Sequence, residues 1–354
     1  MNEKVLMKGN EAIAEAAIAA GCRHFFGYPI TPQTEVAAYM SKRMPKIGGV
    51  YLQAESEVAS INMVLGAGAA GVRVMTSTSS PGISLMAEGI SYLAGSDVPC
   101  LIVNVQRGGP GLGGIQPSQA DYFQATKSTA HGDFHILVFA PSTVQETVDM
   151  IATAFELGDK YRMPAMVLSD GMLGQMMEPV VLPEAREPDN DSKDWAVSGH
   201  KDKREHNVVN SLYINPQELE TLVKARFERY AEIKEKHQMA EEYLADDADI
   251  IIVAYGSSSR VSRSAIDAAR KQGIKVGMIR PITLWPFPEK VIEKHVGHAK
   301  AFLSVEMSMG QMVDDVKLVV NGRVPVEFYG RTGGVIPTPN EVLEQIVRIN
   351  GGVQ

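Results

Sequence analysis

The sequence predicts an α/β protein with two parallel-sheet domains, and three features of its pattern support this fold class. Residues 1–180 alternate short apolar stretches with stretches of helical length. Residues 181–215 are polar, mixed in charge and without periodicity. The alternation resumes at residue 248. Because strands that alternate with helices of about 10–15 residues form parallel sheets with helices on both faces, we expect two such domains joined by a polar linker.

The first domain, residues 1–180, is expected to contain a series of strands connected by helices. The strand patterns occupy residues 24–29, 49–54, 72–78, 99–106, 135–141 and 164–170. The helical patterns occupy residues 9–22, 32–44, 56–71, 82–96 and 142–159. Ligands of open parallel sheets bind at the carboxyl ends of the strands, so the segments that follow each strand hold the candidate site residues.

The second domain is expected over residues 248–354, after a polar linker and a charged helix that together occupy residues 181–247. The charged helix is predicted over 216–245. Strand patterns follow at residues 248–259, 275–281 and 300–307, the first of them running into a Gly/Ser turn. Helical patterns occupy residues 260–273, 287–296 and 337–349.

Composition narrows the class of function. The 354-residue chain has a net charge of −8, so it lacks the positive charge with which proteins bind nucleic acid. We find no signal peptide and no apolar run near the ~18 residues that span a membrane, so we expect a cytoplasmic protein. Cys22 and Cys100 are the only cysteines. Two cysteines cannot hold an iron–sulfur cluster, and any cluster must lie on another chain.

The stretch GYPITPQ, residues 27–33, ends the first strand with two prolines. Thr31 followed by Pro32 is a typical helix start, with threonine as the N-cap and proline in the first turn. A helix N-terminus at the carboxyl end of a strand attracts anions. Two interpretations stay open: Thr31 contacts an anionic ligand, or it only caps the helix.

Charged residues follow two other strands. Glu55 and Glu57 lie at a strand-to-helix junction, where a carboxyl group either complements the helix dipole or acts in proton transfer with a shifted pKa. Arg107 follows the strand at 99–106 and either clamps a ligand carboxylate or forms a surface salt bridge. The local pattern does not decide between these alternatives.

Two polar stretches complete the candidates. TSTSSPG, residues 76–82, is a hydroxyl-rich strand end that either binds a polar ring or caps the next helix. HGDFH contains His131, Asp133 and His135, which could converge on a metal or simply form a polar loop. We assign no metal site, and the role of these three residues stays open.

Several longer stretches occur in an order that resembles a known family. They are GYPITPQTE, QAESEVASINMVLGAGAAG, MTSTSSPGISLMAEGISYLAG, VQRGGPGLGGIQPSQADYFQ, AYGSSSRVSRSAID, VEMSMGQM and GRTGG. Together they are similar to the alpha subunit of 2-oxoacid:ferredoxin oxidoreductases, in particular the 3-methyl-2-oxobutanoate (2-ketoisovalerate) branch. The resemblance covers nearly the whole chain.

The resemblance implies a thiamine-diphosphate pyrimidine-binding domain followed by a transketolase-C-terminal-like domain. It implies the oxidative decarboxylation of a branched-chain 2-oxoacid with coenzyme A to an acyl-CoA, with electrons passing to ferredoxin. Glu57 matches the family glutamate that acts on the pyrimidine ring, and Glu55 is the weaker choice. Arg107 matches the family arginine that pairs with the substrate carboxylate, and Thr31 matches the position that binds that carboxylate or the edge of the cofactor. The expected pyrimidine pocket is lined by Tyr28, Pro29, Ile30, Ser79 and Ser80.

The resemblance also implies partner subunits. A beta subunit is expected to hold the diphosphate, Mg²⁺ and an iron–sulfur cluster, and gamma and ferredoxin-like delta subunits are further candidates. The chain has no Gly-Asp-Gly motif of a diphosphate–Mg²⁺ site, since SDG at residues 169–171 lacks the first glycine. We therefore expect half an active site and no activity of this chain alone. The alternatives are a 2-oxoglutarate enzyme and a non-catalytic assembly subunit.

Overall fold

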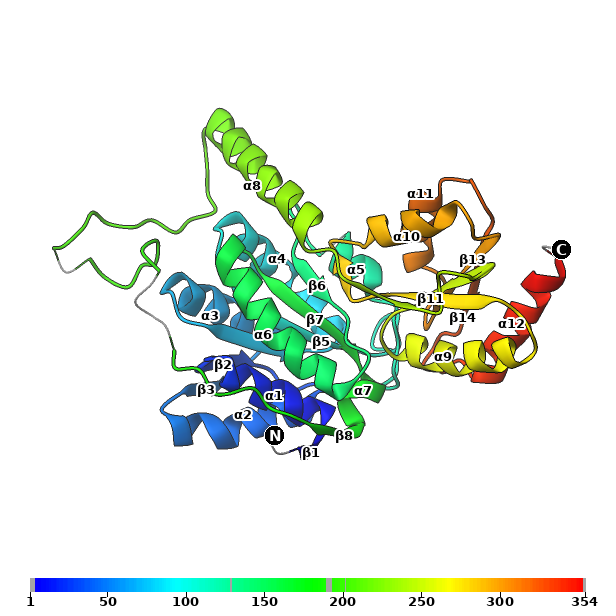
Figure 1. Ribbon diagram of the computed structural model, residues 1–354. Helices are drawn as coiled ribbons and strands as arrows, with labels where there is room; N and C mark the ends of the chain where they lie inside the picture. The colour runs from blue at the N-terminus through cyan, green and yellow to red at the C-terminus, as the bar shows by residue number, and fades with distance from the viewer. Residues whose placement is uncertain (1–3, 128, 189–192, 201, 353–354) are drawn as a thin grey trace.

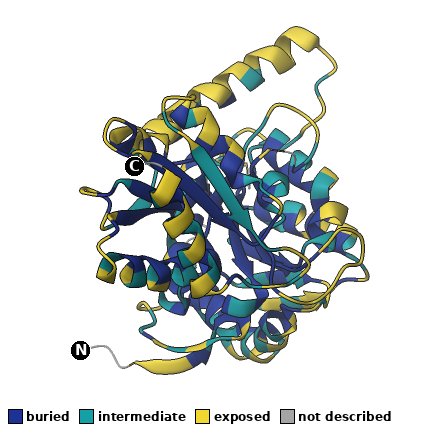
Figure 2. Ribbon diagram, turned by 90° about the vertical axis from the view of Figure 1, so that its right-hand side faces the viewer, coloured by how far each residue is buried: buried dark blue, intermediate teal, exposed yellow. Residues whose placement is uncertain are grey.

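The computed structural model describes residues 4–127, 129–188, 193–200 and 202–352. Two sheets, each flanked by helices, lie side by side along the molecule, and residues before 181 build almost all of the first one (Figure 1). This arrangement confirms the predicted α/β fold class. The strands at the centre of the larger sheet, such as β5, are buried over their whole length (Figure 2).

The larger sheet has seven strands among the described residues. Their order is β12-β6-β7-β5-β4-β2-β3. Their bounds are Thr283–Trp285 (β12), Leu137–Phe139 (β6), Ala165–Asp170 (β7), Leu101–Gln106 (β5), Val74–Thr78 (β4), His24–Gly27 (β2) and Val50–Gln53 (β3). All neighbours pair in parallel except β12, which pairs antiparallel with β6. The carboxyl ends of six strands therefore meet at one edge of this sheet.

Helices cover both faces of the larger sheet (Figure 1). α1 (Gly9–Ala19) packs against α2 (Thr34–Arg43) and α6 (Val144–Tyr161), and α3 (Glu57–Ala69) packs against α4 (Pro81–Gly95). Small residues let α3 and α4 approach closely. A Cβ atom on Gly89 of α4 would lie 2.3 Å from a side-chain carbon of Ile61 on α3, so no larger residue fits there.

The smaller sheet has five strands among the described residues, in the order β14-β13-β10-β11-β9. Their bounds are Val326–Gly330 (β14), Ala301–Glu306 (β13), Ile250–Val253 (β10), Val276–Pro281 (β11) and Ala240–Tyr243 (β9). Its helices are α9 (Gly256–Lys271), α10 (Glu289–Val296), α11 (Met312–Val320) and α12 (Pro339–Gly352). α9 packs against α12, and α10 packs against α11.

Two predicted boundaries in this region are wrong. The charged helix expected over 216–245 is α8, Pro216–Lys236, and residues 240–243 form β9 instead. β9 pairs antiparallel with β11, a long-range contact that local charge patterning does not reveal. The expected Gly/Ser turn before residue 260 is already the first turn of α9, where Ser258 Oγ donates to the Tyr255 carbonyl at 2.8 Å.

Several short elements are absent from the sequence prediction. They are β1 (Val5–Lys8), η1 (Met44–Ile47), α5 (Tyr122–Thr126), α7 (Gly171–Gln175) and β8 (Met177–Val180), in addition to α11, β12 and β14. β1 and β8 pair with each other as a separate antiparallel ribbon. Each of these elements is only three to nine residues long, too short for a clear periodic pattern.

The described part of residues 181–215 contains no helix or strand. Its first half contacts the larger sheet's helices: Arg186 N–H donates to the Ala19 carbonyl at 2.8 Å, and Val197 N–H donates to the Ala69 carbonyl at 2.9 Å. The chain then continues into α8, which projects from the body and is exposed along its outer end (Figure 2). Residues 189–192 and 201 of the predicted linker lie outside the described residues.

Candidate functional site

The candidate site lies at the carboxyl edge of the larger sheet, where β2, β4 and β5 end next to one another. Phe25 of β2 pairs with Met75 of β4, and Thr78 of β4 pairs with Asn104 of β5. The segments that leave these strands start at Tyr28, Ser79 and Arg107, so parallel pairing gathers them at one edge. The predicted site residues thus come from neighbouring strand ends, although they are far apart in the sequence.

Glu57 is the first residue of α3 and is buried, with 4% of its surface exposed. The preceding Ser56 caps the helix, since its Oγ accepts from the Ala59 N–H at 3.1 Å. In the part of the chain that the structure describes, the Glu57 side chain forms no hydrogen bond and no ion pair. Glu55 is exposed. A buried carboxyl group without a partner is costly to keep, so this geometry favours Glu57 over Glu55 as a ligand contact.

The wall beside Glu57 is the corner between β4 and α4. A Cβ atom on Gly82 would lie 2.9 Å from Glu57 Oε1 and 1.9 Å from Thr78 Oγ1, so glycine leaves the space that these two groups occupy. The hydroxyls of Thr78 and Ser79 are buried and have no hydrogen-bond partner among the described residues. Our prediction omitted Thr78 and Gly82, although both lie within the TSTSSPG stretch that drew attention to the corner.

Arg107 follows β5 and is buried, with 7% of its surface exposed. One guanidinium nitrogen donates to the Thr31 carbonyl at 2.9 Å, and another donates to the Leu112 carbonyl at 3.0 Å. Its Nε–H is buried without a partner, and Arg107 forms no ion pair with any residue that the structure describes. The surface salt bridge is therefore the wrong alternative, and the positive charge of Arg107 remains available to an anion.

Thr31 does not cap a helix, which corrects the predicted helix start. α2 begins at Thr34 with Gln33 as its N-cap, and the Thr31–Pro32 peptide bond is cis. Gln33 N–H bonds the Ile30 carbonyl at 3.2 Å, so the chain makes a turn before the helix. The buried Gln33 side chain accepts from Ser77 Oγ at 2.6 Å, a contact across the sheet that sets where α2 begins.

The remaining predicted pocket residues lie around the candidate site, at the carboxyl edge of the larger sheet. Tyr28 is 37% exposed, Pro29 is exposed and Ile30 is partly buried. Ser80 lies deeper, because its Oγ donates to Asp121 Oδ2 at 2.6 Å and its N–H donates to Asn104 Oδ1 at 3.0 Å. Sequence reasoning did not identify Asp121, whose carboxylate comes from a segment that returns to the sheet after residue 108.

A cavity of about 650 Å³ opens beside Arg107, between the two sheets. It is lined on one side by Ser80, Pro81, Ser84, Arg107, residues 108–111, Ala120, Asp121 and Gln124, and on the other by Met309, Gln311 and Thr332. Arg107 is the only cationic residue among these lining residues. The size and position suit a small anionic ligand.

The VEMSMGQM stretch connects the two sheets. The buried carboxylate of Glu306 accepts from the N–H groups of Gln311, Met312 and Val313 at 2.9–3.0 Å, which organises the start of α11. Gln311 Nε2 also donates to the Ala120 carbonyl at 2.7 Å. The GRTGG stretch contacts the same region, since a Cβ atom on Gly334 would lie 2.4 Å from Gln116 Cβ. Both stretches therefore hold the loop after Arg107 in place.

Other polar clusters do not suit a metal. His131 and Asp133 are exposed, whereas His135 stacks on Trp285 with ring centroids 4.7 Å apart, so HGDFH does not converge. Glu242, Asp246 and His295 place ligand atoms within 4.8 Å of one another. Lys294 Nζ, however, is 2.9 Å from Glu242 and 3.4 Å from Asp246. This lysine already neutralises the acids, so we assign no metal to them.

Among the described residues, no helix is both long and apolar enough to cross a membrane.

Comparisons with known proteins find two matching family models. The model described as pyruvate flavodoxin/ferredoxin oxidoreductase, thiamine diP-binding, matches residues 15–246. The model described as pyruvate:ferredoxin oxidoreductase core domain II matches residues 248–342. Together they cover both sheets and the segment between them.

Two full-length relatives are similar over nearly the whole chain. Ketoisovalerate oxidoreductase subunit VorB of Methanothermobacter thermautotrophicus is 49% identical over 346 residues, which covers 98% of each chain. 2-Oxoglutarate synthase subunit KorA of Methanothermobacter marburgensis is 37% identical over 379 residues, which covers 98% of this chain and 99% of that one.

Two solved structures have a similar fold. One is 2-oxoglutarate:ferredoxin oxidoreductase from Magnetococcus marinus with 2-oxoglutarate, coenzyme A and succinyl-CoA bound, with a TM-score of 0.85 and 28% identity. It matches all of this chain, which spans 66% of that longer one. The other is a split gene transketolase, with a TM-score of 0.61 and 13% identity, which bears on the fold alone.

Proposed function

The chain belongs to the pyruvate flavodoxin/ferredoxin oxidoreductase family, and we propose that it is the subunit that binds the pyrimidine ring of thiamine diphosphate in a branched-chain 2-oxoacid:ferredoxin oxidoreductase. The proposed reaction converts 3-methyl-2-oxobutanoate and coenzyme A into the acyl-CoA and CO₂, and ferredoxin accepts the electrons. The observation that carries the proposal is the buried side chain of Glu57, which forms no hydrogen bond or ion pair among the described residues, at the strand edge that also holds Arg107.

The residues at this edge suit the pyrimidine ring. A flat heterocycle with ring nitrogens and an amino group can pair with a carboxyl group and with hydroxyls. The buried hydroxyls of Thr78 and Ser79 have no partner among the described residues, and Glu57 forms no hydrogen bond or ion pair there. Tyr28, Pro29, Ile30 and Ser80 would complete the pocket. When bound, thiamine diphosphate supplies a nucleophilic carbon and accepts the electron pair released in decarboxylation.

Glu57 is the proposed catalytic residue of this chain. Its carboxyl group would share a proton with a ring nitrogen of the pyrimidine, because it is buried and faces no competing donor among the described residues. A hydrogen bond of a largely buried carboxyl group is stronger than one in water. Proton transfer by a positioned carboxyl group contributes about 10²–10⁴-fold to a rate.

Arg107 and Thr31 are the proposed substrate-binding residues. The buried guanidinium of Arg107 would bind the carboxylate of the 2-oxoacid, since it has no ion-pair partner among the described residues. Thr31 is exposed, and its main-chain carbonyl accepts a hydrogen bond from the same guanidinium, so we propose that its hydroxyl also contacts the substrate. The carboxylate leaves as CO₂, so these contacts serve binding and orientation before decarboxylation.

The nature of the cavity favours an apolar substrate side chain. A 2-oxoglutarate enzyme would have to bind a second carboxylate, yet the lining contains one cation, Arg107, together with the acidic Asp121. The relative at 49% identity is named for ketoisovalerate and the one at 37% for 2-oxoglutarate, which supports the same choice. A pocket built for a branched aliphatic side chain needs no second cation.

The proposal also assigns a role to each part of the chain and divides the active site between this chain and a partner subunit. Residues 1–180 would bind the pyrimidine, 181–247 would link, and 248–354 would form the transketolase-C-terminal-like domain. A beta subunit would hold the diphosphate, Mg²⁺ and the iron–sulfur cluster, and gamma and ferredoxin-like delta subunits are further proposed partners. The named relatives are themselves subunits of larger enzymes, which supports a hetero-oligomer.

The decisive experiment is Glu57→Gln in the complex purified with its partner subunits. Glutamine keeps the size and removes the exchangeable carboxyl proton, so we expect kcat with 3-methyl-2-oxobutanoate, coenzyme A and a viologen dye to fall about 10²–10⁴-fold. The subunit composition and thermal unfolding of the complex should not change. Glu55→Gln is the matched control and should retain activity. Near-full activity of Glu57→Gln would instead indicate a non-catalytic assembly subunit.

A further inference from the structure

Asp121, immediately before α5, connects the ends of two neighbouring strands. Its Oδ2 accepts a hydrogen bond from Ser80 Oγ at 2.6 Å and another from Asn104 Nδ2 at 2.9 Å. Its main-chain N–H donates to Gln106 Oε1 at 3.1 Å. Ser80 belongs to the corner after β4, whereas Asn104 and Gln106 belong to β5. A single carboxylate oxygen therefore fastens the β4–α4 corner to the end of β5.

The Asp121 cluster extends to the main chain of Arg107. Ser80 Oγ, which donates to Asp121, also accepts from the Arg107 N–H at 3.0 Å. The Arg107 guanidinium is held independently by the carbonyls of Thr31 and Leu112. The backbone of Arg107 is thus fixed through Ser80 by Asp121, and its charged end is fixed by two neighbouring loops.

Asp121 and Arg107 line the same cavity without forming an ion pair in the described structure. Burial raises the pKa of Asp121, while the hydrogen bonds from Ser80 and Asn104 and the charge of Arg107 act in the opposite direction. Because Oδ2 is engaged by Ser80 and Asn104, the acid stabilises this corner without covering the arginine. The guanidinium keeps its free, buried Nε–H.

We propose that Asp121 is a positioning residue for 2-oxoacid binding, which acts through Ser80 to hold Arg107 in the geometry that receives the substrate carboxylate. This inference rests on the proposed role of Arg107. Asp121 itself makes no contact with the substrate in this scheme. Asp121 affects substrate binding before decarboxylation. Its loss should therefore raise KM for the 2-oxoacid and leave kcat nearly unchanged.

The test is a double-mutant cycle with Asp121→Ala and Arg107→Gln in the assembled enzyme. We expect Asp121→Ala to raise KM for 3-methyl-2-oxobutanoate about tenfold, with kcat within threefold of wild type. We expect no further increase when Asp121→Ala is added to Arg107→Gln, because residues that act through one another are not additive. If the two substitutions acted independently, their separate increases in KM would multiply in the double mutant, and this result would overturn the proposal.

Two further variants keep the proposal testable if Asp121→Ala does not assemble. Asp121→Asn retains a carbonyl oxygen for Ser80 and Asn104, so we expect KM within about threefold of wild type. Ser80→Ala breaks the link to Arg107, so it should raise KM for the 2-oxoacid severalfold, again without further effect on Arg107→Gln. It is assayed at saturating thiamine diphosphate, because Ser80 is also proposed to line the pyrimidine pocket. An Asp121→Asn enzyme with the same high KM as Asp121→Ala, or a Ser80→Ala enzyme with unchanged KM, would contradict the proposal.

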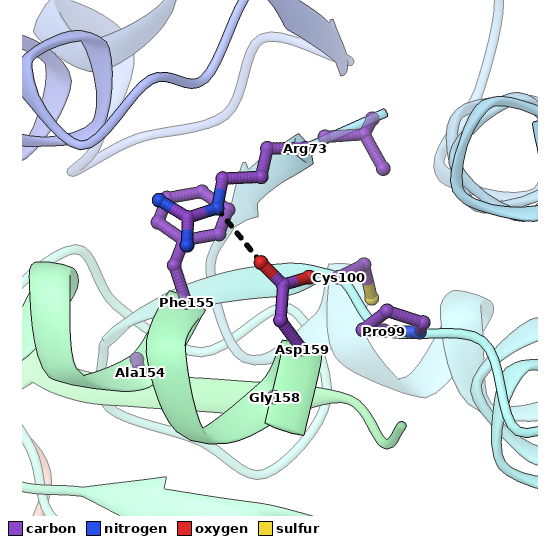
Figure 3. A pocket seen from close by; sticks show the side chains of 8 residues that line it. Arg73, Pro99, Cys100, Ala154, Phe155, Gly158 and Asp159 are labelled. Atoms are coloured by element: carbon purple, nitrogen blue, oxygen red, sulfur yellow. Dashed lines mark hydrogen bonds and ion pairs between the residues drawn. The ribbon is translucent and has the colours of Figure 1, made fainter. Parts of the chain in front are cut away.

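Asp159 is the matched control, because it is a partly buried acid at the opposite edge of the sheet. Its Oδ2 pairs with Arg73 Nε at 2.8 Å (Figure 3). Its Oδ1 pairs with Lys193 Nζ at 2.7 Å. Asp159→Asn should lower thermal stability and leave KM for the 2-oxoacid unchanged.

The Arg107→Gln and Asp121→Ala variants together distinguish a failure of the proposed role of Arg107 from a failure of the proposed role of Asp121. Unchanged KM in Arg107→Gln would refute the proposed function of Arg107, whereas raised KM there with unchanged KM in Asp121→Ala would refute the present inference alone.

Discussion

At the scale of single residues, the main chain and the side chain of Thr31 have separate contacts: only its main-chain carbonyl binds Arg107. The Thr31 carbonyl accepts from the Arg107 guanidinium at 2.9 Å, while the Thr31 side chain is exposed and caps no helix. The carbonyl therefore orients the arginine whatever residue stands at position 31. The proposed contact of Thr31 with a ligand therefore depends on its side-chain hydroxyl.

Thr31→Val tests the hydroxyl separately from the carbonyl. Valine keeps the shape and the main-chain contact, and a hydrogen bond to a charged group contributes about 1.5–3 kcal/mol. We expect KM for the 2-oxoacid to rise about tenfold while the melting temperature stays constant, measured by steady-state kinetics and calorimetry of the complex. Unchanged KM would mean that Thr31 contributes only its carbonyl.

At the scale of elements, β12 joins the two halves of the chain. β12 belongs to the C-terminal half in sequence, yet it pairs with β6 at the edge of the larger sheet. Trp285 of β12 stacks on His135, with ring centroids 4.7 Å apart, and Tyr230 of α8 contacts both rings. The segment before β6, the helix α8 and strand β12 thus share one aromatic cluster.

The aromatic cluster should make stability depend on pH. Burial, with the charges of Lys234 and Lys127, lowers the pKa of His135 from 6.5 to about 4. The unfolded chain therefore binds a proton on His135 more readily than the folded chain between pH 6.5 and about 4, so stability is lost as the pH falls through this range.

His135→Phe should weaken this dependence, because phenylalanine retains the stacking and cannot be protonated. We expect the melting temperature of the variant complex to fall less steeply than that of wild type between pH 6.5 and 4. His131→Phe is the control, since His131 is exposed. Parallel melting curves for His135→Phe and wild type would show that another group dominates the acid sensitivity.

At the scale of the whole molecule, Gln119 joins the loop after Arg107 to the smaller sheet. Its N–H donates to the Met307 carbonyl at 2.9 Å, and its Oε1 accepts from the Met307 N–H at 3.0 Å. Its Nε2 donates to the Tyr255 carbonyl at 2.8 Å. All three residues are buried, so these bonds set how the two sheets enclose the cavity.

Gln119→Ala should destabilise the assembled protein. It leaves the Met307 N–H buried without its partner, which costs about 1–3 kcal/mol, and it removes one of the hydrogen bonds to the Tyr255 carbonyl, which keeps the bond from Ser258 Oγ. We expect the free energy of unfolding to fall by about 1–3 kcal/mol in denaturant titrations. Gln272→Ala, on the exposed end of α9, is the control and should change it little. Equal stability of the two variants would contradict the bridging role.

Much of the fold could be predicted because its information is local. The alternation of apolar and helical stretches predicted the α/β class, and the strand ends at Gly27, Thr78 and Gln106 lie close to the predicted ends. The segments after β2 and β5 contain Thr31 and Arg107, and the segment after β3 leads to Glu57. Parallel pairing places the segments after neighbouring strands at one edge, so these residues could be predicted to lie near one another. Composition alone gave the net charge of −8 and the two cysteines.

The rest depends on contacts between residues far apart in the chain, which periodicity does not encode. The start of α2 is set by the contact between Gln33 and Ser77, and β9 and β12 are strands because they meet β11 and β6. The residue pattern alone identifies the strand ends that hold the candidate site residues. Packing between distant segments buries Glu57 and leaves Glu55 exposed, keeps Arg107 without an ion pair among the described residues, and connects Asp121 to Arg107 through Ser80. These features could not be predicted, because burial and pairing arise only when segments far apart in the chain meet.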